Sequence, residues 1–221
     1  MKRTIVLILF LFAGLMAQKP SPYHWGIVMG FDFSTISGER CGCWKEVHSR
    51  PGLRGGVFME DRQSDLKTLH IGLLYNETGS KWGQPLFGLG YDGDYAIYSL
   101  TYISIPAYYK IKSHIGTLKF DFIIGPMYSY NLSAKQEWVV EVDGPWDIGP
   151  DNIRKEIKRH EFGILYGAAL PIKAGKINLN FLFYKAITKL YSTPIKTYAN
   201  DFQDKYYFRN NTFSLGMEYI F

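Results

Sequence analysis

The stretch Asn211-Thr-Phe-Ser-Leu-Gly-Met-Glu-Tyr-Ile-Phe221 carries an apolar side chain at every second position and stops on Phe221. Successive side chains of a β-strand point to opposite faces, so this spacing predicts a strand with one apolar and one polar face. A tilted strand needs about 9–11 residues to cross the hydrocarbon of a bilayer. The segment therefore predicts a membrane-spanning strand, provided that the rest of the chain repeats the pattern.

Seven further segments repeat the alternation. They cover residues 25–34, 53–60, 69–76, 98–111, 118–125, 162–168 and 177–184. The segment 53–60 is a weaker match, and 98–111 is mostly apolar on both faces, so its inward side is left open. Pro106 within it marks a bulge or an irregular strand end. Together with the last segment, the pattern predicts eight strands.

The connections between these segments alternate in length. Short connections cover residues 61–67, 112–117 and 171–176, and long ones cover 35–50, 77–95, 133–159 and 187–208. Outer-membrane barrels have short periplasmic turns and longer outer loops. The sequence therefore predicts an all-β, eight-stranded, antiparallel up-and-down transmembrane β-barrel. The alternative is a secreted lipocalin-like barrel, which has no reason to alternate loop lengths and turns its apolar side chains toward a shared core.

The N-terminus supplies an export signal. Lys2 and Arg3 precede the apolar run Ile5–Phe12, and Ala13–Ala17 forms a cleavage region. A transmembrane anchor is the weaker interpretation, because a spanning helix needs about 20 apolar residues. We therefore expect a signal peptide at residues 1–17, one barrel domain at 18–221, and a location in the outer membrane of a Gram-negative bacterium.

Composition agrees with this class. The chain has 17% aromatic residues, 17 Tyr and 22 Gly, as suits a barrel with aromatic girdles at both interfaces. Loss of Lys2 and Arg3 with the signal lowers the formal net charge from +5 to +3, which gives no case for a nucleic-acid partner. The five His fit no metal spacing, so neither a metal nor a cofactor is expected. Cys41 and Cys43 are interpreted as a loop-tip pair, either free or disulfide-linked.

The interior of an eight-stranded barrel is filled by side chains, so a passive pore is not expected. Charged side chains that point inward must be paired there. We expect such an interior polar network from seven residues, with Lys119 or Arg54 as the partner of Glu218: Asp32, Arg54, His70, Lys119, Asp121, Glu161 and Glu218.

Three other features have candidate roles at the surface. The ending with Met217, Tyr219 and Phe221 is interpreted as the signal read by the outer-membrane insertion machinery. The segment Glu137–Trp146 contains two Trp and the turn-forming Asp143-Gly144-Pro145, and is predicted to form a hairpin that extends the barrel wall; contact with another protein is the alternative. A basic cluster can bind lipopolysaccharide phosphates or an anionic partner, or can simply flank a solvated loop: Arg154, Lys155, Lys158 and Arg159.

Catalysis would require a nucleophile, a base and an orienting group at one rim of the barrel. The available fragments are His160 with Ser133 and His114 with Ser113, and no G-x-S-x-G motif surrounds any serine. We therefore predict no catalytic residues. A lipid-modifying enzyme and a small-ligand-binding barrel remain as alternative functions.

Five segments, in order, resemble the PorT-like outer-membrane β-barrel proteins. Residues 103–112 resemble that family's "IPL-x-x-K" strand, and 122–135 its "G-P-x-x-x-x-L-L-S-A-K" strand and loop. Residues 162–169 resemble "D-F-G-L-x-x-G-A", with Glu161 where Asp is common. Residues 181–188 are similar to "R-Y-x-x-G-L-T", although the Arg and the Gly-Leu-Thr part are replaced, and 210–221 are similar to the closing strand.

The resemblance implies an eight-stranded outer-membrane barrel from bacteria of the Bacteroides group. It supplies no catalytic residues. Some relatives are linked to protein secretion or gliding, so it implies a structural or interaction module, with a place in a secretion or surface-assembly system. The expected partners are outer-membrane lipid and lipopolysaccharide, the insertion machinery during assembly, and secretion-system proteins.

Overall fold

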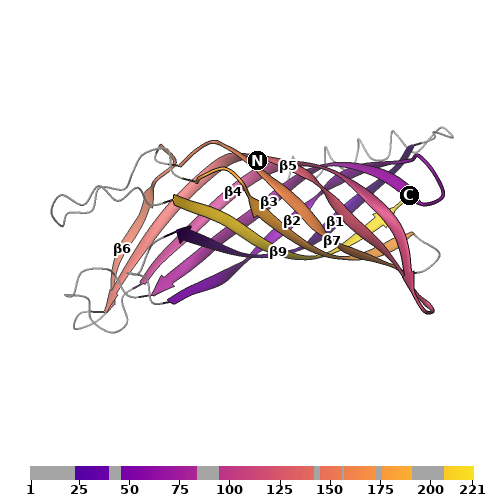
Figure 1. Cartoon of the computed structure of the whole chain (residues 1–221). Helices are drawn as coiled ribbons and strands as arrows, with labels where there is room; N and C mark the ends of the chain where they lie inside the picture. Colours follow the sequence, from indigo (N-terminus) through magenta and orange to yellow (C-terminus); the bar gives the residue numbers. More distant parts are fainter. Residues whose placement is uncertain are drawn as a thin grey trace.

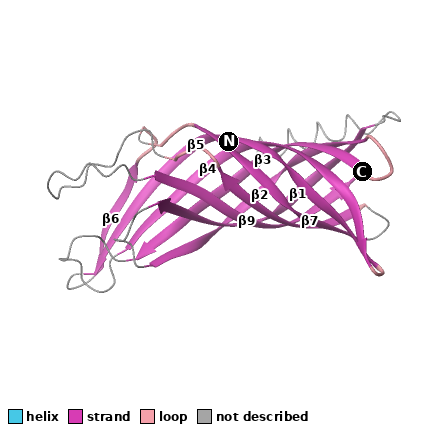
Figure 2. Cartoon of the chain, in the orientation of Figure 1, coloured by secondary structure: helices cyan, strands magenta, loops and turns pink. Residues whose placement is uncertain are grey.

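A computed structural model describes residues 23–39, 46–83, 95–141, 145–155, 157–172, 176–190 and 207–221. Every regular element in these ranges is a strand (Figure 2). No helix in the part of the chain that the structure describes has the length and hydropathy to span a bilayer. The strands are β1 (Tyr23–Glu39), β2 (Glu46–Arg62), β3 (Lys67–Gly83), β4 (Tyr95–Ile115), β5 (Leu118–Glu141), β6 (Pro145–Asn152), β7 (His160–Ile172), β8 (Ile177–Ala186) and β9 (Tyr207–Ile220).

Eight of these strands close into a barrel of tilted strands (Figure 1). Each of β1 to β4 pairs antiparallel with the strand that follows it in the chain. Around the ring, β5 then pairs antiparallel with β7, β7 with β8, and β8 with β9. The ring closes where β9 pairs antiparallel with β1. The ninth strand, β6, pairs with β5 outside this ring. The predicted eight-stranded antiparallel barrel is confirmed.

The two ends of the barrel differ. The connections between β2 and β3, β4 and β5, and β7 and β8 all lie at the end where β9 finishes, and we call this the turn end. The tightest turn has Gly116 and Thr117 between the paired residues Ile115 and Leu118. Gly116 has a φ of 60°, which a residue without a Cβ adopts readily in a two-residue hairpin turn. The opposite end, where β6 lies, is the loop end (Figure 1).

Side chains alternate around the wall as predicted. The apolar set points outward and is exposed, with Phe31 and Phe162 both at 52%. Polar and small side chains such as Ser34 and Ser214 are buried inside. The structure also shows which face of β4 points into the barrel: its inward side chains include Leu100, Ser104, Tyr108 and Lys110. The outward face is the apolar band that lipid requires of a spanning barrel.

The strands are longer than predicted, chiefly toward the loop end. β4 has 21 residues and β5 has 24, against the predicted ranges 98–111 and 118–125. The predicted long connections 35–50, 77–95 and 133–159 were therefore wrong in extent. Beyond the bilayer the outward side chains meet water, so the apolar alternation ends although the backbones remain paired.

The predicted hairpin in the Glu137–Trp146 segment is confirmed. Lys135–Glu141 of β5 pairs with Pro145–Asn152 of β6. On its other side the same part of β5 pairs with Tyr95–Ser99 of β4. The barrel wall therefore continues beyond the apolar band as a sheet of β4, β5 and β6.

Residues from two connections fold over the interior at the loop end. Ile153, Ile157 and Leu190 are buried in one apolar cluster with Ile36 and Leu100 of the wall. The backbone N–H of Lys158 donates to Leu190 O at 2.7 Å and joins the two connections. The N–H of Asn131 in β5 donates to Arg159 O, also at 2.7 Å. These contacts cover the barrel interior on this side with apolar side chains.

Candidate functional site

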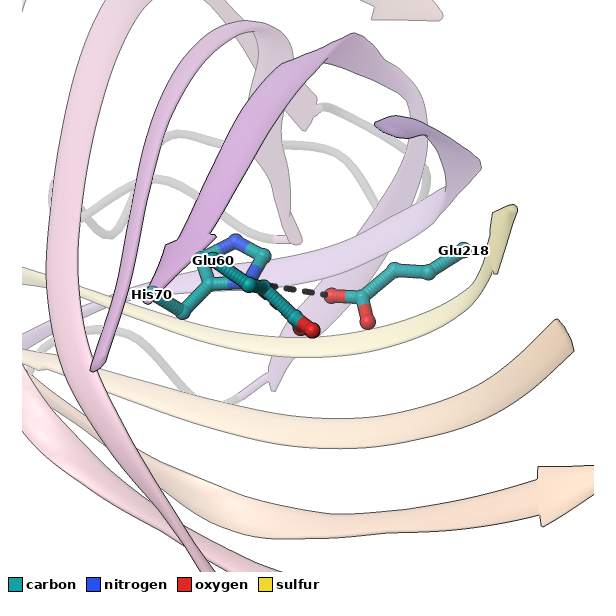
Figure 3. Close-up of side chains that lie close together, drawn as sticks. All are labelled: Glu60, His70 and Glu218. Carbon is teal, nitrogen blue, oxygen red and sulfur yellow. Dashed lines mark hydrogen bonds and ion pairs between the residues drawn. The ribbon is translucent and has the colours of Figure 1, made fainter. Parts of the chain in front are cut away.

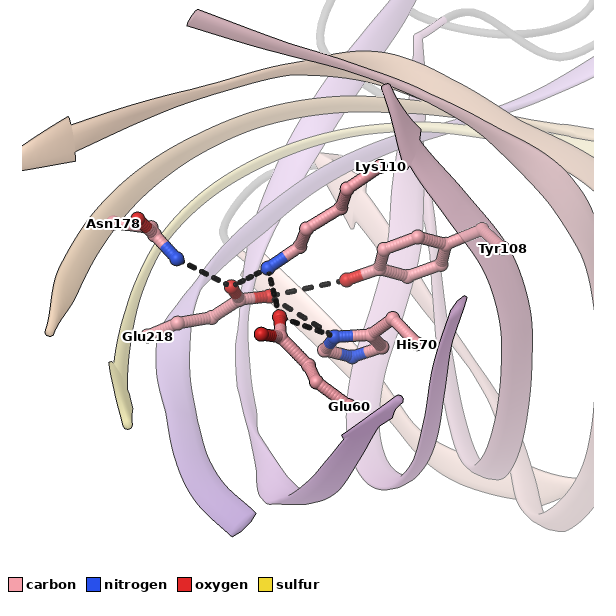
Figure 4. Close-up of polar contacts among 6 residues, drawn as sticks. All are labelled: Glu60, His70, Tyr108, Lys110, Asn178 and Glu218. Carbon is pink, nitrogen blue, oxygen red and sulfur yellow. Dashed lines mark hydrogen bonds and ion pairs between the residues drawn. The ribbon is translucent and has the colours of Figure 1, made fainter. Parts of the chain in front are cut away.

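The densest group of buried polar side chains lies inside the barrel near its turn end. We call it the interior ion-pair network, and its members come from five different strands that all turn these side chains inward (Figure 4). None of the six is more than 4% exposed: Glu60, His70, Tyr108, Lys110, Asn178 and Glu218.

Lys110 lies at the centre of the interior ion-pair network. Its ammonium group donates to Glu60 Oε1 at 2.5 Å and also to Glu218 Oε2. The Tyr108 hydroxyl donates to Glu218 Oε1 at 3.0 Å, and Asn178 Nδ2 donates to Glu218 Oε2 at 3.5 Å. One cation therefore links β2, β4 and β9 across the interior. The two carboxylates are held by charge-assisted bonds, which are stronger than bonds between neutral groups.

The imidazole of His70 is held by its neighbours on every side. Its ring stacks between Phe58, with centroids 4.5 Å apart, and Tyr108, with centroids 4.2 Å apart. His70 Nδ1 lies 3.3 Å from Glu60 Oε1 and 4.0 Å from Glu218 Oε1. Gly125 of β5 lets the β4 backbone at Tyr108 come close, because a Cβ at position 125 would lie 2.5 Å from Tyr108 Cα. This packing fixes the imidazole in one orientation.

Glu60, His70 and Glu218 are also the residues that could hold a metal ion (Figure 3). Their ligand atoms lie within 4.8 Å of one another, and their side chains converge. However, Lys110 already bonds Glu60 Oε1 and a Glu218 oxygen, so an ammonium group occupies the position a metal would need. A metal ion that displaced the Lys110 ammonium group would leave that charge buried without a partner. The donor set therefore fits the lysine, and not a metal ion.

A second polar region lies between the interior ion-pair network and the loop end. Here Arg54 Nη1 is 4.0 Å from Asp32 Oδ1. Asn76 Nδ2 donates to Ser104 Oγ at 3.0 Å, and Ser104 Oγ lies 2.7 Å from Ser129 Oγ. Side chains of this region surround a small cavity, which we call the mid-barrel cavity.

The structure places five of the seven predicted interior residues inside the barrel. Asp32, Arg54, His70, Glu161 and Glu218 are all buried. They fall into two groups, since His70 and Glu218 belong to the interior ion-pair network and the other three line the mid-barrel cavity.

One predicted member and one predicted pairing need correction. Lys119 is exposed beside the turn, because the barrel interior ends before it reaches this position. Asp121 is half-buried on the inward phase of β5, two residues before the buried Ile123, where the charges of Lys110, Glu60 and Glu218 act on it. The partner of Glu218 is Lys110 and not Lys119 or Arg54, because Arg54 faces Asp32.

Sequence reasoning missed Glu60, Tyr108 and Lys110. The segment 98–111 is apolar on both faces, so the period-2 pattern did not show that Tyr108 and Lys110 point inward. Glu60 ends the weakest predicted strand. One signal was present, because Lys110 stands at the Lys of the "IPL-x-x-K" pattern.

The surface candidates lie where a membrane barrel would use them. Lys155, Lys158 and Arg159 are exposed at the loop end, and Arg154 is half-buried there. His160 Nδ1 bonds the Tyr128 hydroxyl at 2.7 Å, and not Ser133. Met217, Tyr219 and Phe221 point outward on β9 and just after it, each at least 40% exposed. The predicted signal peptide and the Cys41–Cys43 pair lie outside the described residues.

Comparison with known proteins gives one family and a set of similar folds. The sequence model of one protein family, described as the outer membrane protein beta-barrel domain, matches residues 16–192. No curated protein matches the chain. Neisserial surface protein A is 12% identical with a TM-score of 0.43, covering 91% of this chain and 98% of that one. OprG from Pseudomonas aeruginosa is 13% identical with a TM-score of 0.47, covering 90% and 96%. Ail, the attachment invasion locus protein of Yersinia pestis, is 12% identical with a TM-score of 0.41, covering 90% and 98%.

Proposed function

We propose, from the premise that this chain belongs to the outer membrane protein β-barrel domain family, that it is a non-catalytic structural or interaction module. The chain lies in the outer membrane, and its turn end faces the periplasm while its loop end faces outward. Its working surface in this proposal is the part of the barrel wall that rises above the membrane.

The observation that carries the proposal is the filled interior. The interior ion-pair network occupies the periplasmic half, and the cluster of Ile153, Ile157 and Leu190 covers the outer side. Between them the described residues enclose the small mid-barrel cavity. An interior filled by side chains in this way favours contacts with other molecules at the outer surface.

The wall offers a large outer surface. At about 3.4 Å per residue, the 24 residues of β5 are about 80 Å long. With a tilt of about 40°, they rise about 60 Å, roughly twice the hydrocarbon thickness of about 30 Å. The hairpin of β5 and β6 lies in this outer part and ends the sheet. A sheet edge of this kind can add a strand from a partner.

The resemblance to the PorT-like proteins favours a finer assignment. Five segments stand in the family's order, and the resemblance covers most of residues 66–221. We propose on this basis that the chain comes from the Bacteroides group and serves a protein secretion or surface-assembly system. Exposed Lys155, Lys158 and Arg159 lie at the outer end, where their charges can contact lipopolysaccharide phosphates.

A non-catalytic role is supported by the surroundings of His70 and His160, two of the five histidines that the structure describes. His70 is enclosed by Phe58, Tyr108 and Glu60. His160 is bonded to Tyr128. Neither histidine has a serine, threonine or cysteine nucleophile in a hydrogen bond within the described residues, as acyl transfer to a lipid would require.

Site-directed photocrosslinking in native cells tests this proposal. A crosslinking amino acid at position 137 or 146 should capture the same partner protein reproducibly, because both positions lie in the outer hairpin. The matched control is position 118, which lies beside the periplasmic turn. Failure to capture any consistent partner from the hairpin, or capture of the same partner from position 118, would contradict an outward-facing interaction module.

A further inference from the structure

The mid-barrel cavity has a chemistry that the interior ion-pair network does not share. It is lined by inward side chains of several strands and has room for roughly one water-sized particle. The lining side chains that carry oxygen atoms include Asp32, Asn76, Thr78, Glu161 and Tyr184. Arg54 is the positively charged side chain of the lining.

Glu161 is a buried carboxylate without a cationic partner. It is 3% exposed, and within the described residues no Lys, Arg or His nitrogen lies within 4.0 Å of it. Its contact with the Tyr102 hydroxyl is long, at 3.4 Å. Arg54, the cation of this cavity, is placed toward Asp32. A buried charge requires a compensating charge or a proton, because the barrel interior solvates it poorly.

The unpartnered atoms around the cavity are mostly oxygens. Within the part of the chain that the structure describes, Asp32 Oδ1, Asn76 Oδ1, Thr78 Oγ1 and Tyr184 OH are buried without a hydrogen-bond partner. The amide nitrogen of Asn76 is already used in its bond to Ser104, which leaves its carbonyl oxygen free. Arg54 Nε is the one unpartnered nitrogen of the lining among these residues. The two hydroxyls can donate as well as accept, so the cavity has more acceptors than donors because of the Asp32 and Asn76 oxygens.

We propose that the mid-barrel cavity binds one alkali metal cation of the sodium class. Hard cations take carboxylate, carbonyl and hydroxyl oxygens as ligands, which is the set that this lining supplies. With all three groups ionised, Asp32, Arg54 and Glu161 together carry one net negative charge, which a monovalent cation neutralises and a divalent one does not. A water molecule could fill the same space but would leave the Glu161 charge uncompensated. This inference rests on the fold alone and not on the proposed function.

The test is cation-specific stability of the purified, detergent-folded protein. The urea midpoint of unfolding is measured in sodium chloride and in choline chloride at equal ionic strength, because choline is too large for the cavity. A bound cation stabilises the folded barrel by mass action. We expect a higher midpoint in sodium chloride for the wild type and for the control Asp65→Asn, which removes one exposed charge at a turn.

Two variants locate the effect. Glu161→Gln keeps the shape of the side chain and removes its charge, so the difference between the two salts should vanish. Thr78→Val removes one oxygen and keeps the charge, so the difference should shrink; this variant serves if Glu161→Gln does not fold. Equal midpoints of the wild type in both salts would overturn the proposal in favour of a protonated Glu161. An undiminished sodium effect in Glu161→Gln would also overturn it.

Discussion

At the scale of single residues, Lys110 organises the barrel interior. It bonds two carboxylates from strands that do not neighbour its own, Glu60 of β2 and Glu218 of β9. Paired buried charges contribute little net stability relative to an apolar filling, but an unpaired buried charge is strongly destabilising. The consequences of altering the interior ion-pair network therefore depend on which partners remain.

Replacing Lys110 with methionine should destabilise the barrel by about 3–5 kcal/mol, because Glu60 and Glu218 lose their cation while remaining buried. The measurement is the free energy of unfolding by urea in detergent or lipid. Lys112→Met is the matched control, since Lys112 lies two residues further along β4 and is exposed. The triple change Lys110→Met, Glu60→Gln and Glu218→Gln should lose less stability than Lys110→Met alone. A Lys110→Met protein as stable as wild type would show that the carboxylates need no cation.

At the scale of single strands, β9 shows how one segment serves two environments. Its inward side chains Ser214 and Glu218 are buried, whereas Leu215 between them is 39% exposed on the outer face. Leu215 is paired with Phe31 of β1 and with Phe181 of β8, which also point outward. These three side chains form a continuous apolar row, so this part of β9 faces hydrocarbon.

Leu215→Arg should therefore destabilise the membrane-inserted barrel by about 2–4 kcal/mol, the usual penalty of a cation near the bilayer midplane. Reversible unfolding from lipid vesicles measures it. Leu118→Arg is the control, because Leu118 is 56% exposed beside the Gly116 turn, at the end of the barrel, where we expect a cation to cost about 0–1 kcal/mol. Equal losses for the two variants would place Leu215 outside the membrane as well.

At the scale of the whole molecule, the two ends of the barrel have different surfaces. Tight turns lie at the turn end, while the loop end carries the β5–β6 hairpin and the connection that contains Lys155 and Lys158. Both lysines are exposed, as is Lys176, which directly precedes β8 at the turn end. Trypsin accessibility of these lysines therefore reports the orientation of the barrel in the membrane.

Trypsin added to whole cells should cut within residues 136–158, after Lys155 or Lys158, and should spare residues 171–176. Cleavage after Lys176 should appear once the outer membrane is permeabilised, because the protease then reaches the periplasm. Mass spectrometry of the fragments identifies the cut sites. Early cleavage after Lys176 in intact cells, with Lys155 and Lys158 protected, would reverse the orientation.

The eight spanning strands were predictable from the sequence, and so were the two faces of every strand except β4. Alternation with period 2 is a local property, and lipid demands it on every strand, so a segment such as 211–221 shows its outward face without any neighbour. The same reasoning identified Asp32, Arg54, His70, Glu161 and Glu218 as interior residues. The alternation could not show where the strands end above the membrane, because outward side chains that meet water do not need to be apolar.

Only the tertiary structure decided which inward side chains meet. Lys110 contacts residues that lie 50 and 108 positions away in the chain, and these contacts depend on the register of every strand between them. A shift of one residue in one strand would turn its inward side chains outward, so pairing inside the barrel is a property of the closed ring. Closure likewise brought Ile153, Ile157 and Leu190 over the interior and left Glu161 without a cationic partner among the described residues. The sequence alone determined that the wall faces lipid; the closed ring determined the contents of its interior.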